Sequence, residues 1–158
     1  MTMPQQYAPV IAAIRETLDR EIPILESIPE NILSERRNAQ NRTIKQLLGH
    51  LVDSASNNHQ RMVRLQYTAH LVFPDYTQDN DCWIAIQDYQ SADWHDLIQL
   101  WKYYNFHIIR VIRSVDPATL DNEWTDFEGN RVTLHQMIEG YTGHLNLHLN
   151  EIKALLQE

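Results

Sequence analysis

Two histidines near the C-terminal end of the sequence, His144 and His148, have the spacing of metal ligands. They lie in a run with helical periodicity, and side chains four residues apart on a helix point to the same side. Both imidazoles can therefore reach one point in space. His148 falls within the apolar arc of this predicted helix and His144 at the edge of that arc, so we expect both to point into the protein.

A third imidazole, His50, is expected on a neighbouring helix. Together the three side chains would form a three-histidine site with open coordination positions, where a metal keeps a water or substrate ligand. Ligation by imidazole alone favours a divalent transition metal over magnesium or calcium. We expect zinc or nickel, with iron also compatible.

Two familiar metal motifs are absent from the sequence. No glutamate stands three residues before a histidine, which excludes the di-iron type of helix bundle. Leu145 follows His144, so the His-Glu-x-x-His motif of zinc proteases is not formed either. The alternative interpretation of each histidine is a hydrogen-bonded core residue that binds no metal.

Four segments with the apolar periodicity of amphipathic helices are expected to position these histidines. They span residues 7–25, residues 43 to about 67 or 69, residues 91 to about 112, and residue 133 to the end of the sequence. Thr43 with Gln46, and Thr133 with Gln136, form capping boxes that mark two of the helix starts. Ser91 is the expected N-cap of the third helix. The sequence predicts an all-α four-helix bundle that forms a single domain over residues 1–158.

Prolines and polar residues separate these helices. Pro23 is expected to kink or shorten the end of the first helix, and residues 27–41 are expected to form a loop. Residues 70–90 are expected to be a long crossover between helices 2 and 3 with one or two helical turns. Within residues 114–132 we expect at most a small hairpin, and no other strands.

Polar residues on the second and third helices are candidates for a substrate pocket. Asn57 and Arg61 share a stripe with His50 on one flank of the apolar arc. Asn105 projects into a buried stripe, where an amide without a partner costs about 1–3 kcal/mol, so it requires a partner or a ligand. We expect Asn57, Arg61 and Asn105 to line the pocket. Asp53 lies further round, toward the side opposite the apolar arc, and is the candidate carboxylate that orients a ligand histidine.

Composition limits the class of protein. The 13 Lys and Arg residues against 21 Asp and Glu residues give a net charge of −8 with no basic cluster, so we expect no nucleic-acid partner. The single cysteine, Cys82, fits a reducing compartment and is expected to be an ordinary thiol. The sequence shows no signal peptide and no apolar run of about 18 residues, so we expect no membrane association. The expectation is a cytoplasmic protein with a small-molecule substrate.

Three stretches of the sequence resemble the DinB-like superfamily. Residues 43–54 and 133–148 are similar to its two signature segments, and residues 100–107 are similar to its middle section. The resemblance implies a four-helix bundle with a long second crossover, commonly dimeric, and a three-histidine metal site that maps onto His50, His144 and His148. One departure is Arg42, where many members carry an aromatic residue, and it concerns the packing at the helix start.

The resemblance leaves the activity open. Similar members include transferases and isomerases that depend on low-molecular-weight thiols such as bacillithiol or mycothiol, and metal-dependent hydrolases. The first hypothesis is therefore a homodimeric metal-dependent enzyme, either a hydrolase or a low-molecular-weight-thiol S-transferase. The second is a non-catalytic metal-binding or stress-response bundle protein.

Overall fold

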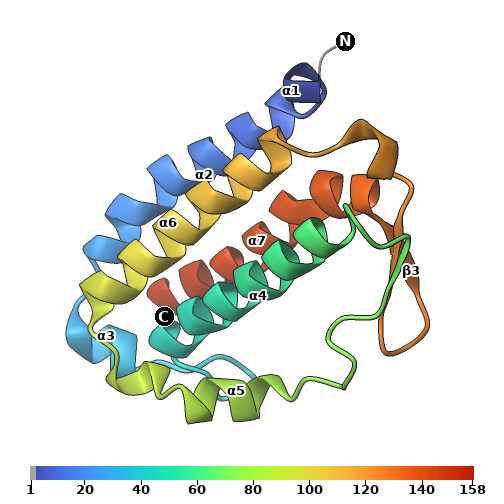
Figure 1. The fold of residues 1–158 in the computed structure, drawn as a ribbon. Coiled ribbons are helices and arrows are strands. Elements are labelled where there is room, and N and C mark those ends of the chain that lie inside the picture. Colours follow the sequence, from blue (N-terminus) through green and yellow to red (C-terminus); the bar gives the residue numbers. More distant parts are fainter. Residues whose placement is uncertain (1–2) are drawn as a thin grey trace.

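Four long helices form a bundle in the computed structural model, which describes residues 3–158 (Figure 1). They are α2 (Ala8–Glu26), α4 (Ile44–Arg64), α6 (Trp94–Arg113) and α7 (Leu134–Leu156). Helix α4 packs on α6 and α7, and α2 closes the ring by packing on the same two helices. Figure 1 shows α4 and α6 running in the same direction, with α2 and α7 running against them. The predicted all-α four-helix bundle is confirmed.

The core lies along the bundle axis and draws on all four helices. The apolar arcs predicted from periodicity face it, and Ile14, Leu48, Trp101 and Leu149 are each at most 2% exposed. Burial of these faces is the main force that holds the helices together, since isolated helices of this length are marginal in water.

The helix starts follow the capping signals closely, with one correction. Thr43 and Thr133 both form complete capping boxes with the glutamines three residues later. Helix α6 begins at Trp94 and is capped by Asp93, whose carboxylate accepts a hydrogen bond from the backbone of Asp96. The expected cap Ser91 belongs instead to the short 3-10 helix η1 (Tyr89–Ser91), because the extended backbone of Ala92 separates the two helices.

The first third of the chain contains more helix than expected. Helix α2 continues through Pro23 to Glu26, so the proline does not shorten it. Residues 27–41 contain a short helix, α3 (Glu30–Glu35), where only a loop was expected. Its Leu33 is buried in the core, and this burial stabilises the helix within an otherwise polar segment. A further short helix, α1 (Met3–Gln6), precedes α2.

The long crossover between α4 and α6 contains the expected helical turns as α5 (Asn80–Ile86), followed by η1. Arg42 stands where many members of the DinB-like superfamily carry an aromatic residue, and here it anchors the crossover. Its side chain is buried, and its Nη2 lies 2.9 Å from Oδ1 of Asp81 in α5. The arginine therefore ties α5 to the start of α4.

A small sheet joins the two irregular segments. Strands β2 (Glu123–Thr125) and β3 (Arg131–Thr133) form the expected antiparallel hairpin, after the 3-10 helix η2 (Pro117–Thr119). Strand β1 (His70–Leu71) in the crossover pairs in parallel with β2, which periodicity did not predict. This pairing holds the crossover against the hairpin at one end of the bundle.

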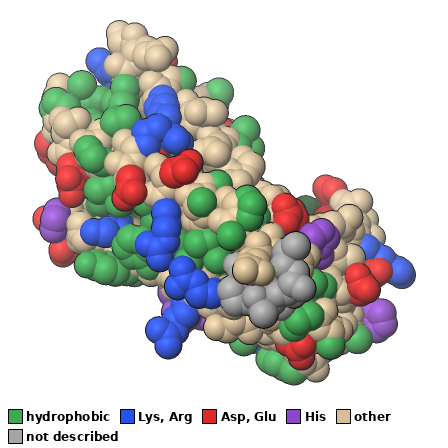
Figure 2. Space-filling view, turned by 90° about the horizontal axis from the view of Figure 1, so that it is seen from above, with side chains coloured by type: hydrophobic (Ala, Val, Ile, Leu, Met, Phe, Trp, Pro, Cys, Tyr) green, Lys and Arg blue, Asp and Glu red, His purple; other side chains and the backbone are tan. Residues whose placement is uncertain are grey.

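The surface is mixed in character. On the face drawn in Figure 2, acidic and basic side chains are interspersed among polar and apolar ones. Within residues 3–158, no helix combines the length and the apolar character needed to cross a membrane.

Candidate metal centre

The structure brings the three predicted histidines together. The ring centroids of His50 on α4 and His148 on α7 are 4.7 Å apart, and those of His144 and His148 are 4.8 Å apart. The planes in each pair are nearly perpendicular, at 84° and 75°. His148 thus lies between the other two imidazoles, where the apolar arcs of α4 and α7 meet.

Two of the imidazoles are oriented through Nδ1. His148 Nδ1 lies 3.0 Å from Oε2 of Glu151, one turn further along α7. His144 Nδ1 lies 3.3 Å from the hydroxyl of Ser54 on α4. A carboxylate partner fixes the proton on Nδ1 and leaves Nε2 as the electron-pair donor, which is how ligand histidines are commonly held.

Burial favours the neutral form of His50 and His144. It lowers the pKa of His50 to about 4, with further lowering by His148, Arg42 and His144 nearby. Burial is also the largest cause that lowers the pKa of His144, followed by the proximity of His148. A neutral imidazole is the form that binds a metal, so neither side chain must lose a proton at neutral pH.

The donor set fits a transition metal, although its atoms are not yet gathered around one point. Among residues 3–158, no group of three or more His, Cys, Asp or Glu side chains is arranged so that it could hold a metal ion. Two imidazoles bound to one ion at about 2.0–2.1 Å have centroids roughly 4.5–5.2 Å apart. The observed separations of 4.7 and 4.8 Å match that range. His50 Nδ1 is also buried without a hydrogen-bond partner.

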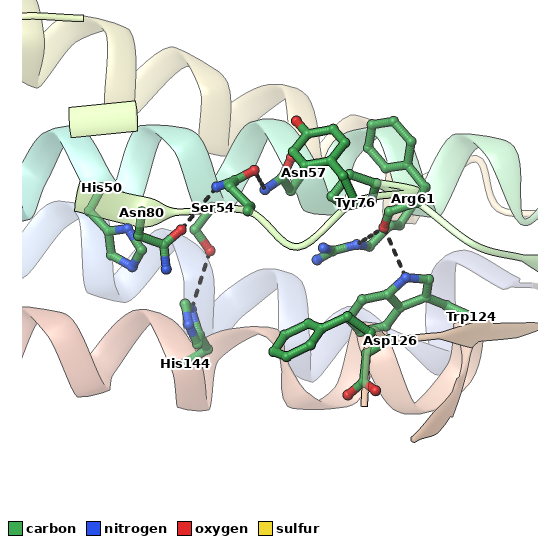
Figure 3. A pocket seen from close by; sticks show the side chains of 13 residues that line it. His50, Ser54, Asn57, Arg61, Tyr76, Asn80, Trp124, Asp126 and His144 are labelled. Atoms are coloured by element: carbon green, nitrogen blue, oxygen red, sulfur yellow. Dashed lines mark hydrogen bonds between the residues drawn. The ribbon is translucent and has the colours of Figure 1, made fainter. Parts of the chain in front are cut away.

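A cavity of about 260 Å³ opens beside His50 and His144. Its walls come from α4, the crossover, the β2–β3 hairpin and α7 (Figure 3). Asn57 and Arg61 line it, as expected from their stripe on α4. The size suits a small molecule rather than a polymer.

A row of amides forms the crossover side of this cavity. Asn57 Nδ2 donates to Gln78 Oε1, and Gln78 Nε2 donates to Asn80 Oδ1, each at 3.0 Å. The row ends at Asn80, which lines the cavity together with His50 (Figure 3). The sequence analysis missed Gln78 and Asn80, because they lie in an irregular segment whose path a helical projection does not describe.

Asn105 does not line the cavity. It is fully buried, donates through Nδ2 to the carbonyl of Trp101 at 2.8 Å, and accepts the Tyr141 hydroxyl on Oδ1 at 2.7 Å. The partner that its buried position required is therefore Tyr141 of α7 and not a substrate. Cys82 is exposed on α5 and also lies outside the cavity lining.

Asp53 is buried at 3% exposure, not on an open side of α4. The crossover covers it, and its Oδ1 accepts hydrogen bonds from Gln87 at 2.8 Å and from the Tyr89 hydroxyl at 2.7 Å. Its Oδ2 is buried without a partner. Burial raises the pKa of Asp53, while the two hydrogen bonds lower it. Of the carboxylates, Glu151 and not Asp53 contacts a histidine of the cluster.

The protein is a four-helix bundle with a cluster of three histidines between two of its helices, and similarity to known proteins identifies its family. The chain belongs to the DinB superfamily, whose family model matches residues 13–152. Among solved structures, YfiT from Bacillus subtilis is similar, with a TM-score of 0.84 and 17% sequence identity over 97% of this chain and 87% of that chain. YfiT is described as "a probable metal-dependent hydrolase with an unusual four-helix bundle topology". No curated protein matches the sequence significantly.

Proposed function

We propose that this protein is a metal-dependent enzyme that acts on a small molecule in the cavity beside His50 and His144. The observation that carries the proposal is the proximity of three imidazoles from α4 and α7, of which His50 and His144 line that cavity. His50, His144 and His148 would hold a divalent zinc, nickel or iron ion. When bound, such an ion is a Lewis acid that lowers the pKa of a water or thiol.

The surrounding side chains hold the imidazoles in place. Glu151 fixes His148, and Ser54 contacts His144. His50 Nδ1 and Asp53 Oδ2 are both buried without partners, and the two residues are one helical turn apart on α4. A hydrogen bond between them, direct or through a water, would satisfy both atoms. Asp53 would then orient His50 in the metal-bound protein.

Hydrolysis is the reaction we favour. Its support is the likeness in fold to YfiT, together with a cavity that places polar amides beside the imidazoles. The same ion would equally activate a low-molecular-weight thiol for S-transfer. The two reactions differ in whether a second substrate must enter with the first.

Metal analysis tests the site. The protein is purified without a histidine tag, loaded with zinc or nickel, desalted, and analysed for metal per chain by mass spectrometry. We expect about one equivalent in the wild type and its loss in His148→Ala, because three ligands are the usual minimum for such sites. His95→Ala is the matched control, since His95 is exposed on α6 and does not line the cavity. A wild type that binds no metal would refute the proposal.

Activity screens separate the reactions. One panel follows hydrolysis of small esters and amides, and another follows conjugation of a low-molecular-weight thiol to an electrophile, each with loaded and metal-free protein. Metal-dependent turnover in the first panel supports a hydrolase, and in the second an S-transferase. A loaded protein that is inactive in both would favour the non-catalytic bundle. The homodimer stays a prediction, which light scattering would check.

A further inference from the structure

Arg61 is a partly buried cation without a counter-ion. Its Nε donates to the carbonyl of Phe73 at 3.0 Å, and its guanidinium carbon lies 3.9 Å from the centroid of the Trp124 ring. No carboxylate among residues 3–158 lies within ion-pair distance of it. The carbonyl and the indole therefore hold the guanidinium in place and leave its terminal nitrogens as free donors.

The surroundings of Arg61 favour the binding of an anion. Burial lowers the pKa of Arg61 to about 10, so the side chain remains charged at neutral pH although it has lost part of its hydration. A charge that is partly desolvated and unpaired is held at a free-energy cost, which an anion would reduce. Arg61 lines the 260 Å³ cavity and also a neighbouring one of about 340 Å³, so an anion can reach it.

The acidic residue that shares the cavity with Arg61, Asp126, already has hydrogen-bond partners. Asp126 raises the pKa of Arg61 through its charge, but its carboxylate accepts hydrogen bonds from the backbone of Glu128 and Asn130 and from the Asn130 amide. These bonds hold it in the β2–β3 turn. Figure 3 shows the Asp126 carboxylate pointing away from Arg61. Within residues 3–158, the cavity therefore contains an unpaired cation and a single acidic residue, Asp126, that does not pair with it.

The position of Arg61 relative to the imidazoles suits a bound substrate. Arg61 follows His50 by eleven residues on α4, which is about 16 Å along the helix axis. Figure 3 shows the two at opposite ends of the cavity, with His144 across from them on α7. A molecule that is anchored at Arg61 and long enough to cross the cavity would therefore present its other end to the imidazoles.

We propose that this cavity binds a small monocarboxylate, with the carboxylate on the Arg61 guanidinium and the reacting bond near His50 and His144. The planar guanidinium matches a carboxylate with two parallel hydrogen bonds. A phosphate dianion is a poorer match, because Arg61 is the only Lys or Arg in the cavity lining and Asp126 adds a negative charge. Phe73, Tyr76 and Trp124 supply apolar surface for the carbon skeleton. This assignment deepens the proposed function by naming its substrate class.

The test measures binding in metal-free protein, so that its result does not depend on the metal site. Isothermal titration in the presence of a chelator compares benzoate with the isosteric benzamide and with phenyl phosphate. We expect benzoate to bind more tightly than either. Arg61→Gln should weaken benzoate binding by about 10- to 100-fold, since a hydrogen-bonded charge pair contributes about 1.5–3 kcal/mol.

Two further variants complete the design. Arg61→Lys keeps the charge but not the planar pair of donors, so it should weaken benzoate binding by an intermediate factor even if Arg61→Gln fails to fold. Arg110→Gln, on the exposed side of α6, should leave binding unchanged. Equal binding of benzoate by wild type and Arg61→Lys, or tighter binding of phenyl phosphate or benzamide than of benzoate, would overturn the assignment. Arg61 variants that lose benzoate binding but still take up metal would show that the carboxylate site can be removed without affecting the metal site.

Discussion

Gly49, the residue before His50, is a position where the fold requires the absence of a side chain. Tyr89 of η1 lies directly on it, and a Cβ atom at residue 49 would be 2.2 Å from Cγ and Cδ2 of the tyrosine ring. Ordinary contacts begin at 3.4 Å, so the ring would have to retreat by roughly 1.2 Å. The close approach lets the Tyr89 hydroxyl reach Asp53 Oδ1 at 2.7 Å.

Gly49→Ala should therefore destabilise the protein. Forcing one methyl group into packed surroundings costs about 1–3 kcal/mol. Stretching the hydrogen bond from Tyr89 to Asp53 costs about 1.5–3 kcal/mol more, because its acceptor is a carboxylate. Alanine recovers about 0.5–1 kcal/mol in a helix interior. The net loss is about 2–5 kcal/mol, which for a chain of this length lowers Tm by roughly 5–15 °C.

Thermal and denaturant unfolding of metal-free protein would measure this loss. Gly140→Ala is the matched control on α7, because a Cβ atom there meets nothing within 4 Å, and its stability should be unchanged or slightly higher. In a Tyr89→Ala background, Gly49→Ala should no longer destabilise, since the ring that it strikes is gone. The reasoning would be refuted if Gly49→Ala were as stable as the wild type, or lost the same stability in both backgrounds.

Three further substitutions test the groups around the site. Asp53→Asn should raise the Tm of metal-free protein at pH 7, because burial raises the pKa of Asp53 and makes its charge costly, and an amide oxygen can still accept hydrogen bonds. That gain should shrink as the pH falls toward 3.8, where the wild-type carboxyl becomes neutral in both folded and unfolded protein. The same variant should lower metal affinity by about 10- to 100-fold, and a lower Tm at pH 7 would contradict the argument. Glu151→Gln should weaken metal affinity by about tenfold or more in calorimetric titration, because the partner of His148 Nδ1 loses its charge, and unchanged affinity would exclude that role. Tyr141→Phe should cost about 1–3 kcal/mol in denaturant unfolding, since Asn105 Oδ1 is left buried without a donor, while metal stoichiometry stays the same. Pairing it with Asn105→Leu should recover part of that loss, and an unaltered wild-type stability in Tyr141→Phe alone would count against it.

The helices and the approach of the three histidines could be predicted because both follow from local periodicity. An apolar arc fixes which side of a helix faces the core, and the i,i+4 spacing places His144 and His148 on one side of α7. His50 comes close to these two histidines once the apolar arcs of α4 and α7 pack against each other. Asn57 and Arg61 line the cavity for the same reason, since they share the flank of α4 that carries His50.

The surroundings of Asp53 and Asn105 could not be predicted from helical periodicity. A helical projection gives the direction of a side chain relative to its own helix, but not what covers that direction. Asp53 points away from the apolar arc, yet the crossover folds over it and supplies Gln87 and Tyr89 as donors. Asn105 points into the core as expected, but its partner comes from α7, more than thirty residues further along the chain. Long-range packing decides both cases.

The segments without periodicity build the part of the cavity that selects a ligand. The parallel pairing of β1 with β2 brings the crossover to the hairpin, so that the carbonyl of Phe73 accepts hydrogen bonds from both Arg61 Nε and Trp124 Nε1. Regular helices thus supply the imidazoles, whereas the crossover and the hairpin fix the guanidinium at the other end. Irregular segments can change while the bundle that they cover stays the same. The bundle can therefore stay the same while the crossover and the hairpin change which ligand the cavity accepts, and in this chain Arg61 and Trp124 are the pair that these segments hold in place.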